Sequence, residues 1–319
     1  MNSDKVYDCA VIGAGAAGMT AALYCARAGL KTIVLETSSA GGQLQTIDKI
    51  ENYPSYESIT GADLSLAMRN QVMNTDVELA EFSKATKADL VSKVKCIESD
   101  EGSVYAHSVI IASGSSVIHL DVENEEKLCG HGIHYCAACD GNFYKGRTVG
   151  VVGGGNSAVS AALYLSRIAS KVIMIRRKES FNCEDILLDR IKNTENIQIL
   201  YNWDLTDVLG DEHVIAANIK NTKNSSSTVI SLDAVFVFIG YRPQTDIFMG
   251  QINTDDDGYI ITDGEMCTSI EGVYAAGDVR QKKHRQITTA VSDGTIAALS
   301  ASRYINVKVK AMKSIEKVD

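Results

Sequence analysis

Two glycine-rich turns, each set between an apolar strand and a helix, constrain the fold of this chain more than any other feature. The first turn, GAGAAG at 13–18, follows the apolar run 6–12 and opens a small-residue helix that ends near Gly29. A buried strand follows at 31–35, and Glu36 stands at its end. This order of elements predicts a β-turn-α-β unit.

The same order returns in the middle of the 319 residues. An apolar strand at 148–152 is followed by GGGNSA at 153–158, a helix at 159–169 and a strand at 171–175. The chain therefore contains two mononucleotide-binding units. Its predicted class is α/β, with two Rossmann-like dinucleotide-binding domains.

Two breaks in the pattern predict that the second unit is inserted into the first domain. Strand-like segments between the two units close on the turn ASG at 112–114, where we expect the first crossing. The second crossing follows the run 235–239, where glycine, arginine and proline interrupt the apolar residues. The predicted domains are 1–115 with 245–319, and the inserted 116–244.

The charge balance argues against a nucleic-acid or anionic-membrane partner. The formal net charge is -9 and the sequence pI is about 5.2. Such polyanionic surfaces are bound through clustered Lys and Arg, and an excess of acidic residues disfavours that binding.

The uncharged stretch 9–26 could be mistaken for a signal peptide or a membrane span. Aspartates precede it instead of a positive region, and three glycines interrupt it, so we expect neither. The expected compartment is the reducing cytoplasm. There, the eight cysteines are not expected to form a structural disulfide framework, and a close pair indicates a catalytic or metal-binding role.

The first turn has the residue types that a pyrophosphate requires. Gly13 permits the tight turn, Gly15 lets the backbone approach the phosphates, and Gly18 allows close packing of helix on strand. The helix amino terminus supplies amide donors, and Glu36 can accept hydrogen bonds from ribose hydroxyls. The alternative is a glycine turn that only packs a helix on a strand.

The second turn has Gly153, Gly155 and Ala158 at the matching positions, and Ala still allows helix packing. Positive charge after its second strand suits a ribose 2'-phosphate, which favours NADPH over NADH. Arg176, Arg177 and Lys178 supply this charge. The alternative is a solvated basic patch.

The pair Cys136 and Cys139 is the predicted chemical centre. In a C-x-x-C on the first turn of a helix both sulfurs can reach disulfide distance, and the terminal amides favour a thiolate. Asp140 could donate or accept a proton as a thiol leaves or is regenerated. Its alternative role is capping of the helix.

A zinc site is the competing interpretation of this region. Five potential ligands lie close together, namely Cys129, His131, His134, Cys136 and Cys139. Their spacing is irregular and no second C-x-x-C completes a tetrahedral set, so we expect no metal. The other cysteines are expected to be small buried hydrophobes.

The ordered set of motifs resembles the low-molecular-weight thioredoxin reductases over nearly the whole chain. The motifs are GAGAAG, GGQL at 41–44, CAACDG at 136–141, GGGNSA, GYRPQT at 240–245 and AAGDV at 275–279.

The resemblance implies FAD in the first domain and NADPH in the inserted one. The residues implied for FAD are Gly13, Gly15, Ala16, Gly18, Glu36, Gly42, Gln43, Leu44, Asn52, Gly114, Gly277, Asp278, Arg285, Gln286 and Ile287. Among them, Asp278 would hold the ribityl chain. The residues implied for NADPH are Gly153, Gly155, Asn156, Ser157, Ala158, Arg176, Arg177 and Lys178.

The resemblance also implies the reaction and the partners. Electrons would pass from NADPH through FAD to the Cys136/Cys139 disulfide and then to oxidised thioredoxin, with Cys136 as the more exposed attacking thiol. Members of the family are homodimers.

Two departures from the family pattern leave the electron donor open. Ser160 and Ala161 replace an acidic pair, and Asn182 replaces the last arginine of the phosphate-binding motif. Reduced ferredoxin is the alternative donor, and a peroxiredoxin-like or glutaredoxin-like protein is an alternative acceptor. A zinc-stabilised nucleotide-binding module is the non-enzymatic alternative.

Overall fold

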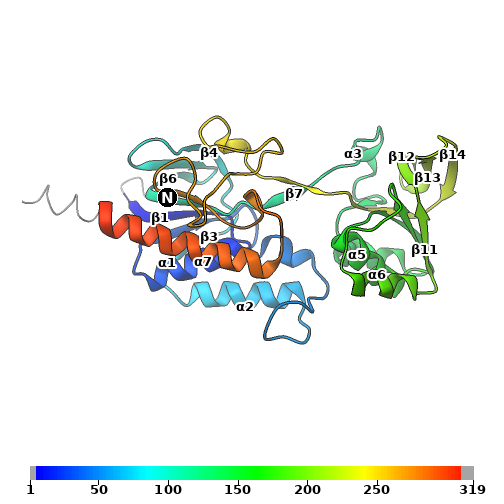
Figure 1. The fold of residues 1–319 in the computed structure, drawn as a ribbon, viewed down its shortest axis with the longest axis horizontal. Helices are drawn as coiled ribbons and strands as arrows, with labels where there is room; N and C mark the ends of the chain where they lie inside the picture. The colour runs from blue at the N-terminus through cyan, green and yellow to red at the C-terminus, as the bar shows by residue number, and fades with distance from the viewer. Residues whose placement is uncertain (1–4, 310–319) are drawn as a thin grey trace, which may run out of the picture. The chain divides into compact units, whose positions relative to one another are not determined.

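The computed structural model describes residues 5–309 and divides into two compact units. Unit 1 contains the residues up to Ser116 and those from Arg242 onward, and unit 2 contains Val117–Tyr241. In Figure 1, unit 2 carries the green segments and unit 1 the blue, cyan and orange ones. The predicted α/β class, with the second Rossmann-like unit inserted into the first, is confirmed.

The chain passes between the units through two short paired strands, β7 (Ser115–Val117) and β16 (Tyr241–Pro243). The boundaries fall after residues 116 and 241, whereas the sequence predicted crossings after 115 and 244. At the second crossing the break of the apolar pattern includes Gly240 and the whole of β16, so the chain returns to unit 1 inside the break and not after it.

Unit 1 is built on a seven-stranded sheet in the order β3-β2-β1-β6-β5-β4, with β17 also paired to β6. The pairs β3-β2, β2-β1, β1-β6 and β6-β17 are parallel, and β6-β5 and β5-β4 are antiparallel. The strands are β1 (Val6–Ile12), β2 (Thr32–Leu35), β3 (Glu78–Ala80), β4 (Ala85–Asp89), β5 (Lys95–Ser99), β6 (Gly102–Ile111) and β17 (Val273–Ala275).

Three helices cover one face of this sheet, as Figure 1 shows. They are α1 (Ala16–Arg27), α2 (Gly61–Met73) and α7 (Ile287–Tyr304), the last continued by a π-helical turn, Ile305–Val309. Along β1, Cys9 and Val11 pack toward the helices, whereas Ala10 and Ile12 pack in the cluster on the opposite face. Small residues bring α1 and α7 close together, since a Cβ at Gly294 would lie 2.2 Å from the Ala17 carbonyl oxygen.

Short 3-10 turns connect these elements. In unit 1 they are Gly42–Thr46, Asp246–Phe248 and Gly277–Val279, and in unit 2 Gly141–Tyr144. No helix within residues 5–309 has both the length and the apolar character that crossing a membrane requires.

Unit 2 is built on a parallel five-stranded sheet in the order β11-β10-β9-β15-β8. The strands are β8 (Ile133–His134), β9 (Thr148–Gly153), β10 (Lys171–Arg176), β11 (Ile197–Tyr201) and β15 (Ala234–Phe238). One face packs on helices α5 (Asn156–Ser166) and α6 (Asp185–Lys192).

An antiparallel sheet covers the other face of the unit 2 sheet. Its strands are β12 (Trp203–Gly210), β13 (Val214–Asn221) and β14 (Ser227–Ser231). Two short helices, α3 (Glu125–Leu128) and α4 (Ala137–Asp140), flank β8 along the chain. The glycine turn follows β9 and the cysteine helix α4 follows β8, and β15 lies between these two strands in the sheet.

A half-buried ion pair fixes the segment that leads into the GGQL motif. Arg69 of α2 donates to both carboxylate oxygens of Glu81, from Nε at 3.0 Å and Nη2 at 2.5 Å. The backbone N–H of Ala40 donates to the same carboxylate at 2.8 Å. The Arg69 hydrogen bond lowers the pKa of Glu81, and the Ala40 amide acts in the same direction.

We predict that the Glu81 carboxylate stabilises the fold above the ordinary glutamate pKa of about 4.3 and that this contribution is lost as pH falls through the lowered folded-state value. Glu81→Gln should lower the unfolding temperature at neutral pH by about 2 to 4 °C. The difference from wild type, followed by circular dichroism, should shrink below about pH 4. An equal difference at both pH values would contradict this role.

Candidate functional site

The first glycine turn joins β1 to α1 and leaves open space at its middle glycine. Gly13 has φ +100°, and a Cβ there would lie 2.4 Å from the Ala112 carbonyl oxygen. A Cβ at Gly18 would lie 1.9 Å from the Gly13 carbonyl oxygen. At Gly15, no described atom other than those of Gly15 itself and its neighbours along the chain lies within 4 Å of the Cβ position. No side chain caps α1, which begins at Ala16. The turn therefore offers uncapped amides beside free space, which fits a phosphate.

Glu36 lies at the end of β2, next to this turn. Its Oε2 accepts a hydrogen bond from the Ala14 N–H at 2.7 Å, and its Oε1 accepts one from the Ser38 N–H at 3.0 Å. The side chain is half-buried. These two amides hold the carboxylate beside the turn, and its contact with ribose stays a prediction.

The GGQL segment approaches the same turn from the other side. A Cβ at Gly42 would lie 3.2 Å from the Cα of Gly15. Leu44 is buried, whereas Gln43 is exposed and donates from Nε2 to the Ser115 carbonyl oxygen at 3.0 Å. Two glycine backbones therefore face one another with no side chain between them.

Asp278 carries a buried acceptor that the described chain does not satisfy. It lies in the turn that follows β17, after Gly277, whose φ is +80°. Its Oδ1 is buried and receives no hydrogen bond from the residues that the structure describes. Lys282 Nζ is 3.3 Å away and forms an ion pair with it, without hydrogen-bond alignment. Buried acceptors are normally hydrogen-bonded, so this oxygen suits a hydroxyl donor of a ligand such as the ribityl chain of FAD.

A buried ionic network behind Asp278 was missed by the sequence analysis. Asp293 of α7 accepts from Arg280 Nη1 at 3.0 Å, Lys282 Nζ at 3.1 Å and the Gly277 N–H at 3.1 Å. Asp293 is 6% exposed. The sequence did contain a signal for this network: Asp293 is the one acidic residue in α7, where it stands among small and apolar residues.

The remaining residues implied for FAD lie at the start of α7 and at the crossing. Gln286 caps α7, which begins at Ile287, and accepts from Asn52 Nδ2 at 3.3 Å. The Arg285 guanidinium lies over the Tyr259 ring, 4.1 Å from its centroid. Gly114 has φ +69°. The structure brings Asn52 and Gln286 together, although they are far apart in sequence.

The second glycine turn joins β9 to α5, and here too the first glycine of the turn lies so close to backbone that a side chain would not fit. A Cβ at Gly153 would lie 2.3 Å from the Phe238 carbonyl oxygen and 3.0 Å from the buried Cβ of Ala158. Gly155 has only the Asn182 carbonyl oxygen nearby, 3.8 Å from its Cβ position. The Asn156 side chain donates from Nδ2 to the Glu184 carboxylate at 3.2 Å and accepts at Oδ1 from the Glu184 backbone N–H at 2.8 Å. Ser157 is exposed.

The three basic side chains at the end of β10, those of residues 176–178, differ in exposure: one packs against the glycine turn and two are exposed to solvent. The Arg176 guanidinium lies against Gly154, and its Nε donates to the Ser180 carbonyl oxygen at 2.9 Å. Arg177 is exposed, with Nη1 3.9 Å from an Asp204 carboxylate oxygen. Lys178 is exposed as well. Arg177 and Lys178 are therefore the side chains presented to solvent beside this turn.

Cys136 and Cys139 form a disulfide across the first turn of α4, with their Cα atoms 5.4 Å apart. Cys136 is the N-cap residue, and its Sγ accepts from the Cys139 N–H at 3.1 Å. The family resemblance implied that Cys136 is the more exposed sulfur. In the structure Cys136 is half-buried and Cys139 is exposed, because the capping position turns the first sulfur toward the helix backbone.

Asp140 belongs to a hydrogen-bonded chain beside this disulfide. Its Oδ2 lies 3.1 Å from His134 Nδ1, and His134 Nε2 lies 2.8 Å from the Tyr144 hydroxyl. Burial lowers the pKa of His134, although Asp140 acts in the opposite direction. Burial and the Asp140 charge raise the pKa of Tyr144. The sequence had grouped His134 with possible zinc ligands, and its pairing with Asp140 was missed.

No group of three or more His, Cys, Asp or Glu side chains within residues 5–309 is arranged to hold a metal ion. The zinc interpretation therefore has no support in the described geometry.

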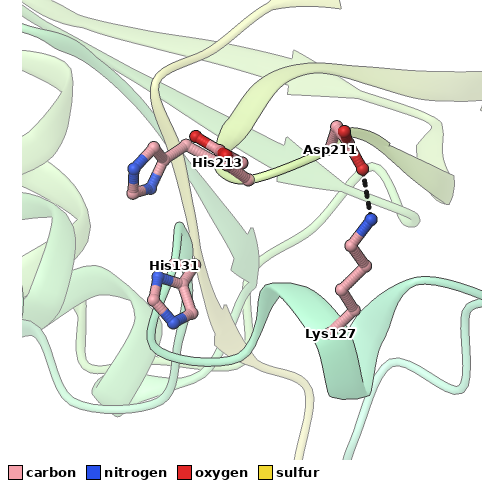
Figure 2. Close-up of a pocket in the computed structure, with 5 residues that line it drawn as sticks. Lys127, His131, Asp211 and His213 are labelled. Carbon is pink, nitrogen blue, oxygen red and sulfur yellow. Dashed lines mark hydrogen bonds and ion pairs between the residues drawn. The ribbon is translucent and has the colours of Figure 1, made fainter.

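A surface pocket of about 530 Å³ lies elsewhere in unit 2 (Figure 2). Lys127 and Asp211 form an ion pair across it, and the rings of His131 and His213 lie 5.7 Å apart. Glu212 completes the lining. The pocket contains none of the residues expected to bind a nucleotide or to react.

Comparison with known proteins agrees with this arrangement. Residues 7–294 match the family model described as pyridine nucleotide-disulphide oxidoreductase. A thioredoxin reductase of Listeria monocytogenes is 40% identical over 305 residues, which cover 95% of each chain.

Two solved structures extend the comparison. The thioredoxin reductase of Lactococcus lactis is 37% identical, with a TM-score of 0.92 over 94% of this chain and 99% of that one. A ferredoxin-flavin thioredoxin reductase of Clostridium acetobutylicum is 28% identical, with a TM-score of 0.53 over 95% of this chain and 99% of that one.

The two glycines of the first turn should respond differently to alanine. Gly18→Ala should lower the free energy of unfolding by about 1 to 3 kcal/mol, because its methyl group would meet backbone. Gly15→Ala should change it by less than about 0.5 kcal/mol yet reduce flavin retention after gel filtration, because the methyl group fills ligand space. Full flavin retention in Gly15→Ala would place the nucleotide elsewhere.

Proposed function

Because this chain belongs to the pyridine nucleotide-disulphide oxidoreductase family, and within it to the thioredoxin reductases, we propose that it reduces oxidised thioredoxin with electrons from NADPH. The observation that carries the proposal is the Cys136–Cys139 disulfide at the start of α4, in a chain with two glycine turns open at their middle glycine. Bound FAD would supply the two-electron chemistry between the nicotinamide and this disulfide.

Unit 1 would hold FAD and unit 2 would hold NADPH. The open space at Gly15 and the unsatisfied Oδ1 of Asp278 fit the pyrophosphate and a ribityl hydroxyl. In unit 2, the space at Gly155 fits a second pyrophosphate, and the exposed Arg177 and Lys178 fit a 2'-phosphate. The other residues that the resemblance implied are proposed for these sites on the same basis.

The reduced cysteine pair would act by thiol–disulfide exchange. One thiolate attacks the thioredoxin disulfide, so that a mixed disulfide forms and a thioredoxin thiolate leaves. The second thiol of the pair then attacks the mixed disulfide, which restores Cys136–Cys139 and releases the second thioredoxin thiol. Asp140 would hold the proton that passes from each attacking thiol to each leaving sulfur.

The cellular setting belongs to the same proposal. A reduced dithiol is maintained most readily in a reducing cytoplasm, where we place the protein. We also propose a homodimer, as the family resemblance implies, and light scattering of the purified protein would measure its mass directly.

We predict that anaerobic NADPH bleaches the flavin absorbance of both wild type and Cys139→Ser, but that only wild type then reduces thioredoxin. A single thiol cannot close the intramolecular disulfide that completes the exchange, so turnover should fall to background. Stopped-flow absorbance and thioredoxin-coupled NADPH consumption measure the two steps separately. Thioredoxin turnover by Cys139→Ser would rule out the dithiol relay.

Ferredoxin is the second candidate donor, because Ser160, Ala161 and Asn182 replace residues of the NADPH-binding pattern. Similarity to a ferredoxin-flavin thioredoxin reductase also supports it. Reduction of the flavin by reduced ferredoxin and not by NADPH would establish this alternative.

Arg177→Ala should raise the Michaelis constant for NADPH by roughly tenfold and leave the maximal rate nearly unchanged, because it removes ground-state binding of the 2'-phosphate. Arg147→Ala is the matched control. The two arginine side chains are equally exposed, each 67%, and each pairs with an aspartate. Arg147 precedes β9, at the opposite end of the strand from the glycine turn. Equal effects of the two substitutions would remove Arg177 from the phosphate site.

A further inference from the structure

His134 is a buried, ionisable side chain for which the proposed function gives no role. It ends β8 and is 5% exposed. Its ring stacks on Phe236 of the neighbouring strand β15, with centroids 5.2 Å apart, and meets the edge of the Tyr144 ring at 5.3 Å. Packing on two sides holds the plane of the imidazole, so each nitrogen has one fixed direction.

The two nitrogens of that ring face two different polar groups. Nδ1 faces the carboxylate of Asp140, and Nε2 faces the hydroxyl of Tyr144, at the distances given above. Burial favours the neutral imidazole, which has one donor and one acceptor. With Asp140 ionised, one arrangement satisfies all three groups: Tyr144 donates to Nε2, and Nδ1–H donates to Asp140.

We propose that His134 is a positioning residue that holds the Asp140 carboxyl group for proton transfer during thiol–disulfide exchange, with Tyr144 fixing its tautomer. The inference rests on the proposed function and assigns a residue that the family pattern of motifs did not indicate. His134 binds Oδ2, which leaves Oδ1 outside this chain of hydrogen bonds.

The proton balance of the step is closed within the site. Asp140 takes the proton of the attacking thiol, the new sulfur–sulfur bond forms as the substrate disulfide breaks, and Asp140 returns the proton to the leaving thiolate. The second exchange repeats the transfer. No electron or proton is needed beyond those of the dithiol and the substrate.

The test compares two substitutions that each keep half of the imidazole's hydrogen bonding. The amide nitrogen of His134→Asn lies near the position of Nδ1 and can still donate to Asp140. The longer His134→Gln places its amide near Nε2, so that it reaches Tyr144 and loses Asp140. Both remove the ring, so a loss of packing alone should affect them alike.

Two disulfide probes separate proton transfer from general damage. The full-length holoenzyme is reduced with dithiothreitol, desalted anaerobically and mixed with either dithiobis-nitrobenzoate or 2-hydroxyethyl disulfide. The aromatic thiolate leaves without a proton, whereas the alkyl thiolate is a poorer leaving group and benefits from one. The signal of a Cys136→Ser/Cys139→Ser variant is subtracted, because other cysteines also react.

We expect His134→Gln to slow the reaction with 2-hydroxyethyl disulfide on the order of tenfold more than the reaction with the aromatic probe, because the aromatic probe needs Asp140 only to accept the proton of the attacking thiol. His134→Asn should stay within about threefold of wild type with both probes. Equal slowing of both probes by His134→Gln, equal loss in the two variants, or no loss in His134→Gln would overturn the proposal.

The assay uses neither NADPH nor thioredoxin, so its outcome is independent of the proposed electron donor and acceptor. A wild-type protein that reacts here but is not reduced by NADPH would contradict the proposed function and leave the role of His134 standing. A wild-type dithiol that reacts with neither probe would contradict the proposed function itself.

Discussion

The fold depends on backbone approaching backbone at two turns where a side chain would not fit. In unit 1, Gly18 brings α1 against the carbonyl oxygen of Gly13, at a distance that leaves no room for a Cβ. In unit 2, Gly153 makes the corresponding approach to Phe238 and rests on the small side chain of Ala158. These contacts place the amino terminus of each helix at the carboxyl edge of its sheet. The same geometry that packs the helix therefore presents its free amides to a ligand.

Unit 1 also contains a buried network of charged side chains. Asp293 accepts hydrogen bonds from Arg280, Lys282 and the Gly277 amide, so its negative charge is compensated within the core. Asp278 lies beside this network with one oxygen unsatisfied by the described residues. Burying a charged group is costly unless hydrogen bonds within the protein replace those that it made to water. The network thus keeps the neighbouring carboxylate in place for a ligand that can complete its hydrogen bonding.

The environment of the disulfide combines exposure and burial within one short segment. Cys139 is open to solvent, whereas Cys136 is held at the start of α4 by a backbone amide. Asp140 then links this exposed turn to the buried ring of His134. The exposed sulfur of Cys139 can therefore reach a protein substrate, while the carboxyl group of the next residue, Asp140, is held in position by a buried side chain.

The sequence by itself determined the features that are encoded over short distances. The glycine spacings, the cysteine pair and the alternation of apolar strands with small-residue helices each follow from local backbone geometry, and they were sufficient to predict the α/β class and the inserted unit. Only the tertiary structure decided which sulfur is exposed, that Arg176 folds back onto Gly154 while Arg177 stays in solvent, and that His134 pairs with Asp140. These outcomes depend on side-chain direction and on partners from other strands and helices, which residue spacing along a chain does not specify.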